Sequence, residues 1–218
     1  SLSLEEERRQ ALLRKLKEDL GRSRAKGAES PGPRLSEPVA IGLPSATLSL
    51  QGGAEGEAVG RAVAAGLMRD QLIASIRGSA QSLLQEVANE PDMERIRKLG
   101  HGWRPGPGDF GAAFAEGADE AAARYPLLWG ETPLPLPGKG QTSLIVTAAT
   151  PEMLLANPVL LSAFPGSYRE VLPRMVPGNV WIRWKFVRPG ATSGMAYDGL
   201  VWLGDRFRWI PKPWRLFS

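Results

Sequence analysis

The carboxyl-terminal runs WIRWKFVRPG (181–190), MAYDGLVWLGD (195–205) and RFRWIPKPWRLF (206–217) carry five of the seven tryptophans in this chain. Tryptophan and phenylalanine favour strands, and each buries a large apolar surface when it packs in a core. We therefore expect these three runs to form antiparallel strands and to be the best-ordered part of the fold.

A two-residue turn sets the register of the last two runs. Gly204 and Asp205 suit the loop of a tight hairpin, because glycine supplies the positive φ that such turns need. The pairs that follow are Leu203 with Arg206, Trp202 with Phe207, Val201 with Arg208, and Leu200 with Trp209. The preceding hairpin, closed across residues 189–194, is expected to place Trp181 beside Trp202, Arg183 beside Leu200, and Lys185 beside Asp198.

Because side chains alternate along a strand, this register predicts a sheet with two unlike faces. One face is apolar and is the expected core face, with Ile182, Trp184, Phe186, Tyr197, Val201, Leu203 and Ile210. The other face mixes large aromatic and charged side chains, with Trp181, Arg183, Lys185, Asp198, Leu200, Trp202, Phe207 and Trp209.

The mixed face has two interpretations. It can be an ordinary rim of a core, where the stems of Arg and Lys lie over indole rings. It can also be a ligand pocket, with Trp181, Trp202, Phe207 and Trp209 as walls and Arg183 or Lys185 as the anchor for an acidic group. Asp198 is the candidate acid, because a carboxyl in line with Leu200 and Trp202 must be paired, solvated or shifted in pKa.

Three parts are predicted along the chain: an amphipathic helix over 1–20, a flexible linker over 21–38, and one α+β domain over 39–218. The first helix has a narrow stripe of Leu12, Leu13, Leu16 and Leu20. Such a helix is marginal alone, so it must pack on the body, on a second copy in a homodimer, or on a partner protein. The linker is rich in Gly, Ser, Pro and charged residues, a composition that does not build a core.

Within the domain, helices come first and strands last. Apolar residues at helical spacing predict a core helix over 58–88, and further helices are expected over 91–100 and from an N-cap at Asp109 to Pro126. A strand over 142–150 precedes a helix start at Thr150. This order predicts an α+β fold, with N-terminal helices packed on a curved antiparallel sheet formed mainly by the C-terminal half.

Composition removes several kinds of chemistry. The chain has no cysteine and one histidine, His101, which lies in the Gly- and Pro-rich run GHGWRPGPGD and is expected in a loop. No metal-ligand spacing is present, and PGKGQTS (137–143) and QGGAEGEAVG (51–60) both fail the phosphate-loop or dinucleotide pattern. We therefore expect no cofactor and no metal.

The net charge is +4, and the basic excess lies in the part after residue 165. Charge alone does not indicate nucleic acid, and no nucleic-acid motif is present, so the expected partner is a small molecule or a protein. No apolar run is long enough to span a bilayer. The compartment stays open: cytoplasmic as given, or exported or tethered if a leader precedes Ser1.

The element order and the closing segment DGLVWLGDRFRWIPKPW (198–214) resemble the nuclear transport factor two-like, or cystatin-like, cone fold over residues 58–218. The resemblance implies a curved sheet that wraps a helix and leaves a pocket. Some members use that pocket for isomerase or dehydratase chemistry, and many use it for binding or dimerisation. The His-Asp or Tyr-Asp pairs of those enzymes have no match here, because Tyr197 is expected to face away from Asp198.

The leading hypothesis is a noncatalytic domain that binds a ligand or partner on the aromatic and basic sheet face. The alternative is an isomerase-, dehydratase- or hydrolase-like enzyme acting on a small acidic molecule, with Asp198 as acid–base and Arg183 or Lys185 as anchor. A third hypothesis is a protein-interaction module that uses the N-terminal helix.

Overall fold

The computed structural model describes residues 54–218. The helix predicted over 1–20, the linker over 21–38 and the start of the predicted domain at 39 lie outside the described residues. The helices are α2 (Ala54–Asn89), α3 (Met93–Trp103), α4 (Pro107–Ala113), α5 (Ala118–Trp129), α6 (Pro151–Ala156), α7 (Pro158–Ser162) and α8 (Tyr168–Val171), with 3-10 turns η1 (Leu172–Arg174) and η2 (Pro213–Phe217).

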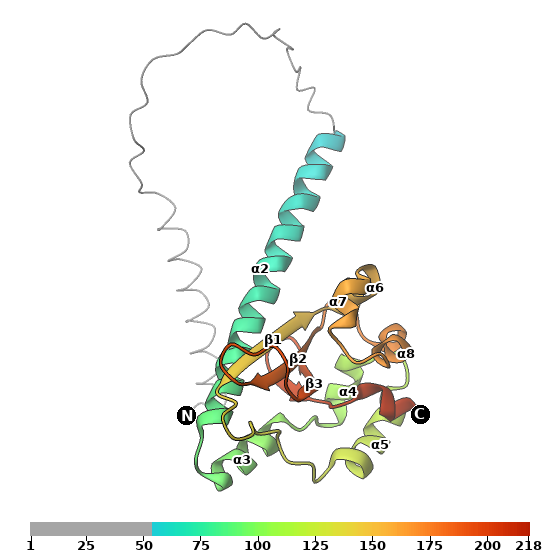
Figure 1. Cartoon of the computed structure of the whole chain (residues 1–218). Helices are drawn as coiled ribbons and strands as arrows, with labels where there is room; N and C mark the ends of the chain where they lie inside the picture. The colour runs from blue at the N-terminus through green and yellow to red at the C-terminus, as the bar shows by residue number, and fades with distance from the viewer. Residues whose placement is uncertain (1–53) are drawn as a thin grey trace, which may run out of the picture. The chain divides into compact units, whose positions relative to one another are not determined.

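Four antiparallel strands form one sheet in the order β1-β2-β3-β4. They are β1 (Ser143–Ala149), β2 (Val180–Val187), β3 (Ala196–Trp202) and β4 (Phe207–Trp209). The predicted α+β class is confirmed, since helices fill the first half of the described chain and the sheet fills the second (Figure 1). No helix among residues 54–218 combines the length and the apolar character needed to cross a membrane.

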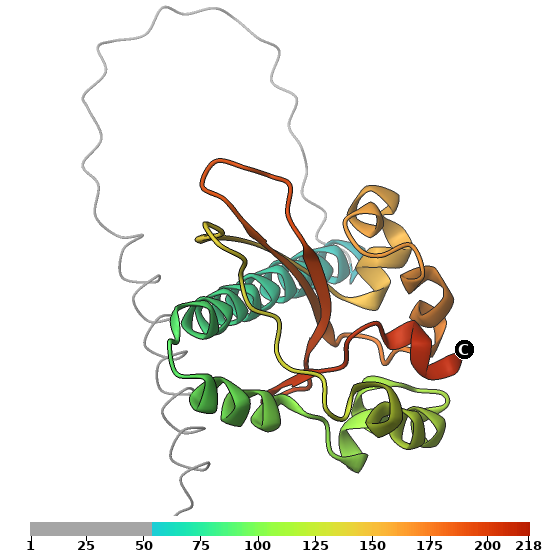
Figure 2. The same cartoon turned by 60° about the horizontal axis from the view of Figure 1, so that its bottom comes forward.

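The sheet separates two apolar cores. On one face, α2 and α3 pack against β1, β2 and the end of β4, and the buried residues include Ile73, Ile76, Ala80, Leu84, Val87, Ile96, Ile182, Trp184, Phe186 and Leu200. On the other face, the shorter helices and η2 cover the sheet, and the buried residues include Phe110, Phe114, Tyr125, Leu154, Tyr168, Trp181, Val201, Ile210 and Leu216. Figures 1 and 2 show α2 along one side and α4 to α8 gathered on the other.

The predicted helix boundaries at Gly100, Asp109 and Pro126 are wrong: α4 begins at Pro107, and α5 contains Pro126 and continues to Trp129. Gly100 does not end α3, which continues to Trp103. The helix predicted from Asp109 to Pro126 is two helices, because the chain leaves the helical conformation at Phe114 and restarts at Gly117, which has a φ of 75°. The break lets Phe114 form a bridge with Met175, a tertiary contact that the helical pattern does not contain. By contrast, Thr150 is the N-cap of α6, as predicted.

The predicted register is confirmed for one hairpin and wrong for the other. Leu200, Val201 and Trp202 pair with Trp209, Arg208 and Phe207, as the Gly204-Asp205 turn requires. Between β2 and β3, however, Trp181 pairs with Val201 and Ile182 with Leu200, one residue away from the prediction, and Lys185 pairs with Ala196 instead of Asp198.

A β-bulge separates these two registers. The pairing shifts between Ile182 and Trp184, so that Asp198 and Gly199 together lie opposite Arg183. Gly199 has a φ of 84°, and a Cβ there would overlap the carbonyl of Ile210. Only glycine fits this position, and the extra residue places Tyr197 and Leu200, three residues apart, on the same face of the sheet.

Candidate functional site

The aromatic residues of the predicted ligand pocket do not share a face. Trp181 is fully buried in the core under the short helices. Trp202, Phe207 and Trp209 pack on the opposite side, in the core beneath α2 and α3. The single aromatic wall expected from the sequence is therefore wrong, because the real β2–β3 register puts Trp181 across from Val201.

Lys185 is also separated from the predicted acid. It pairs with Ala196, and its Nζ donates a hydrogen bond of 3.4 Å to the carbonyl of Thr192 in the loop of the same hairpin. Asp198 and Arg183 remain together, because the bulge on β3 lies directly across from Arg183. These two residues, with Tyr168 and Lys212, form what we call the Asp198 cluster.

Asp198 is 8% exposed. Its Oδ1 accepts a hydrogen bond of 2.8 Å from the backbone N–H of Lys212. Lys212 is the only non-glycine residue with positive φ in the described part of the chain, with a φ of 46°. A left-handed conformation is strained for a side chain with a Cβ, and such strain is concentrated at functional sites and switch points. The carboxyl of Asp198 thus holds the strained residue that directly precedes η2.

Tyr168 supplies the floor of the cluster. Its ring is fully buried and packs edge-on against Phe164 and Trp181. Its hydroxyl faces Asp198 closely enough to interact with the carboxyl electrostatically, yet it makes no hydrogen bond of ordinary geometry to any described residue. The Tyr168 hydroxyl therefore acts on the Asp198 carboxyl, whose pKa it lowers.

Burial raises the pKa of Asp198 to about 6. The N–H and ammonium of Lys212, the Tyr168 hydroxyl and the Arg183 guanidinium all act in the opposite direction, but desolvation outweighs them. Burial also raises the pKa of Tyr168 well above its usual value, and the nearby Asp198 carboxylate adds to that effect. At neutral pH the carboxyl is therefore mostly ionised and close to its titration point.

Among residues 54–218, the Arg183 guanidinium, like the Lys212 ammonium, makes no hydrogen bond, although both lie near Asp198. Arg183 is half-buried, and desolvation lowers its pKa while Asp198 opposes that change. Among the contacts of residues 54–218, Arg183 makes neither a hydrogen bond nor an ion pair. Other cations continue the rim, where Lys212 and Arg215 lie over the ring of Trp129 at 6.0 and 5.9 Å.

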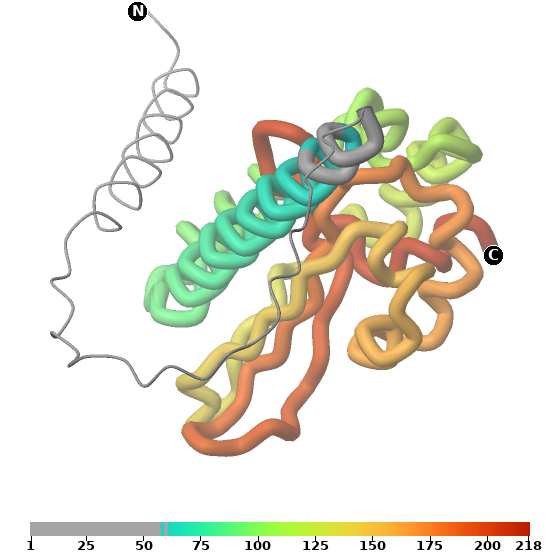
Figure 3. Tube along the Cα trace, turned by 90° about the horizontal axis from the view of Figure 1, so that it is seen from above, coloured from blue at the N-terminus to red at the C-terminus, as the bar shows by residue number. Residues whose placement is uncertain are grey.

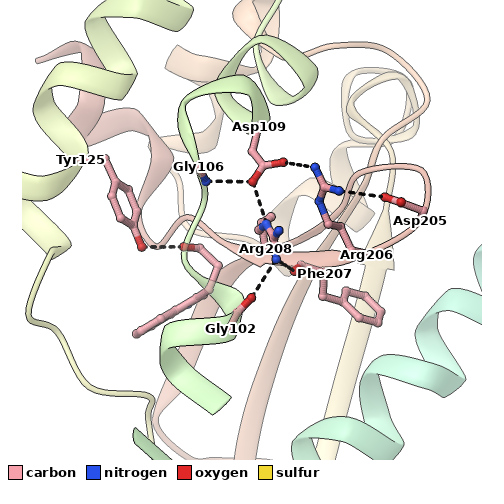
Figure 4. Close-up of polar contacts among 9 residues, drawn as sticks. Gly102, Gly106, Asp109, Tyr125, Asp205, Arg206, Phe207 and Arg208 are labelled. Atoms are coloured by element: carbon pink, nitrogen blue, oxygen red, sulfur yellow. Dashed lines mark hydrogen bonds and ion pairs between the residues drawn. The ribbon is translucent and has the colours of Figure 1, made fainter. Parts of the chain in front are cut away.

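A second charged cluster surrounds Asp109 and connects α4 to β4 (Figure 4). Its carboxylate accepts hydrogen bonds from Arg206 at 2.8 Å, from Arg208 at 2.7 Å and from the N–H of Gly106 at 2.9 Å. Arg208 also donates to the carbonyl of Gly102 at 2.7 Å. Burial alone would raise the pKa of Asp109, but the hydrogen bonds from Arg206, Arg208 and Gly106 lower it.

This cluster is fully paired, so we interpret it as structural. Asp109 is the third residue of α4 and reaches back to the cap residue, Gly106, which corrects its predicted role as N-cap. The two arginines also account for part of the basic character seen in the C-terminal sequence. His101 lies in the last turn of α3 and not in a loop, and no group of residues suited to a metal ion is present among residues 54–218.

An open hollow of about 420 Å³ lies between α4 and α5, and its lining includes Arg104, Phe110, Tyr125 and Glu131 but no residue of the Asp198 cluster. The Tyr125 hydroxyl donates its hydrogen to the carbonyl of Trp209 at 3.0 Å. Comparison of the chain with protein-family models, with curated proteins and with solved structures finds no match.

Sequence reasoning identified Asp198 and Arg183 but missed Tyr168 and Lys212. Tyr168 is 30 residues before Asp198 in the chain, and nothing in its neighbours SYREV indicates a polar role. Lys212 lies in PKP, where the left-handed conformation has no local signal. Both come to Asp198 only because α8 and η2 pack on the same face of the sheet.

Proposed function

We propose that this protein is a noncatalytic binding domain that anchors an anionic group, a carboxylate or a phosphate, at Arg183. The observation that carries the proposal is a half-buried guanidinium that makes no hydrogen bond or ion pair within residues 54–218. Arginine presents a planar fork of donors that matches carboxylate and phosphate oxygens, and desolvation strengthens such pairing.

The charge of the cluster supports the same proposal. Arg183 and Lys212 carry two positive charges beside the single carboxyl of Asp198, and both cations act on its pKa. One positive charge is left over when Asp198 is ionised, and a bound anionic group would balance it. The aromatic walls of the sequence hypothesis are not part of this proposal, because their side chains fill the two cores.

The test is a titration with succinate and with inorganic phosphate, followed by NMR of the arginine Nε–H and tryptophan indole signals. We expect a saturable shift of the Arg183 signal that is lost in Arg183→Gln. Arg188→Gln is the matched control, because Arg188 follows the same strand and its side chain is exposed. The proposal fails if no Arg183 signal shifts in the wild type. It also fails if the tryptophan and other arginine signals of Arg183→Gln still shift and saturate as they do in the wild type.

A second candidate function is acid–base catalysis on a small acidic molecule, and the pairing of Asp198 with Tyr168 favours it. A carboxyl with a pKa of about 6 can exchange protons near neutral pH, and the buried tyrosine hydroxyl beside it stabilises the carboxylate form. In this proposal Asp198 is the acid–base and Arg183 the anchor. A carbon-detected NMR titration of Asp198 with a midpoint near 4 would remove its physical basis.

The relation to the cone fold also remains a proposal. A long helix across one face of an antiparallel sheet supports it, and a Tyr-Asp pair is now present in the form of Tyr168 and Asp198. An experimental structure with a bound anion would test the fold relation and the site together.

A further inference from the structure

Helix α2 is 36 residues long, but only its second half packs on the sheet. The first of its described side chains to be buried is Ile73. Before that point four large apolar side chains are more than half exposed: Val63 at 57%, Leu67 at 59%, Met68 at 71% and Leu72 at 55%. Figure 3 shows α2 running along the outside of the domain with its outer side uncovered by any described element.

The face of α2 that points away from the sheet carries no charged residue between Ala64 and Gln81. Residues recurring at steps of three and four define it: Ala64, Leu67, Gln71, Ala74, Gly78 and Gln81, all exposed. A solvated helix normally carries charged residues opposite its core face. A strip of Ala, Gly, Leu and Gln is instead typical of a helix that another helix covers closely. We call this strip the outer face.

The charged residues of α2 lie along the two edges of the outer face. Arg61 and Glu86 are 25 residues apart, nearly seven turns, so they share one edge. Asp70 and Arg77 are seven residues apart, nearly two turns, and share the opposite edge. None of these four exposed side chains makes an ion pair within residues 54–218.

The sequence midpoint between Arg61 and Glu86 and the one between Asp70 and Arg77 coincide, because both fall between residues 73 and 74. In an antiparallel pair of α2 helices centred there, Arg61 lies opposite Glu86 of the second copy, and Asp70 lies opposite Arg77 of the second copy. The outer faces of the two copies also match in this register. Leu67 of one copy lies opposite Gly78 and Gln81 of the second copy, and the two Ala74 residues lie close to each other at the centre. One twofold register therefore satisfies both edges and pairs the bulky half with the small half.

We propose that the outer face of α2 binds a second copy of this chain as an antiparallel, twofold-symmetric helix pair. The overlap from residue 61 to residue 86 is about 39 Å long and about 10 Å wide, roughly 400 Å² per protomer. A standard interface buries about 800 Å² per partner, so the dimer is reversible and depends on protein concentration. This inference is independent of the anion site on the other side of the sheet.

The absence of native cysteine gives a clean test of register in the full-length chain. Ala74→Cys lies at the twofold axis and is expected to form a disulfide-linked dimer under mild oxidation. Val63→Cys alone should not link to itself, but it should link when mixed with Gln85→Cys. Arg97→Cys, exposed on α3, is the control for random collision. Val63→Cys linking as fast as Ala74→Cys would indicate a parallel pair and overturn the proposal.

Charge exchange gives a second test by sedimentation velocity over a range of concentrations. Asp70→Arg and Arg77→Asp should each weaken self-association at least tenfold, whereas the double variant should restore it. An equimolar mixture of the two single variants should associate better than either alone. A chain that is monomeric at all concentrations, or a double variant as weak as the single variants, would refute the proposed pair.

Discussion

The ionised carboxyl of Asp198 should cost this protein stability, and Asp198→Asn should remove that cost. Burial raises the pKa of Asp198 from 3.8 to about 6 in the folded protein. Between pH 3.8 and about pH 6, Asp198 is therefore mostly protonated in the folded protein and mostly ionised in the unfolded chain. Stability from this group is fully present below pH 3.8 and is lost as the pH rises through 6.

The size of the effect follows from the shift. A difference of about two pKa units corresponds to roughly 3 kcal/mol between the two ends of the titration, at about 1.4 kcal/mol per unit. The asparagine side chain of the variant keeps an oxygen that can accept a hydrogen bond from the Lys212 N–H, so this bond survives the substitution. The free energy of unfolding of Asp198→Asn, minus that of the wild type, should rise by about 2 to 3 kcal/mol between about pH 4 and pH 7.5.

Urea denaturation at several pH values measures this difference directly. Other groups titrate over the same range, but they do so in both proteins and cancel. Asp119→Asn, at an exposed position in the first turn of α5, is the control and should show no comparable rise. A constant difference, or one that falls as the pH rises, would mean that Arg183 and Lys212 stabilise the carboxylate more than burial destabilises it.

Further substitutions test the bulge and the Asp109 cluster. Gly199→Ala should destabilise the protein by about 2 kcal/mol or more, because the positive φ and the nearby Ile210 carbonyl both disfavour a Cβ. Urea denaturation measures this loss, and an unchanged stability would contradict the bulge geometry. Asp109→Ala should cost about 2 to 3 kcal/mol at pH 7 by removing three charge-assisted hydrogen bonds, whereas Asp205→Ala, which loses a single exposed contact of 3.8 Å, should cost under about 1 kcal/mol. Because the pKa of Asp109 is lowered, its contribution is present above its ordinary value of 3.8 and is lost as the pH falls below that value, so the Asp109→Ala and wild-type stabilities should converge in acid.

The stability cost of Asp198 bears on function. A buried acid that weakens the fold at neutral pH has no packing benefit over asparagine, and natural proteins retain such groups where a site needs them. The paired Asp109 cluster is the opposite case, since its pKa is lowered and its charges stabilise the fold. The contrast between the two aspartates, one costly and one stabilising, adds to the argument from Arg183 for placing the site at the Asp198 cluster.

Local sequence patterns were sufficient for the elements that depend on neighbours in the chain. The core helix over 58–88, the strand after residue 142, the Thr150 cap and the Gly204-Asp205 hairpin all follow from periodicity, capping or turn chemistry, which act over a few residues. The absence of cysteine and the α+β class are likewise properties of composition and element order.

The candidate site, by contrast, exists only because distant segments pack together. In the sequence Gly199 is indistinguishable from an ordinary strand glycine. Only the tertiary structure shows that it has a positive φ and that the Ile210 carbonyl leaves no room for a Cβ there. That bulge shifts the β2–β3 register by a residue, sends Trp181 and Trp202 to different cores, and turns Asp198 toward Tyr168 and Lys212. Strand register depends on such long-range contacts, because a local pattern with a period of two is satisfied equally well by pairings that differ by a bulge.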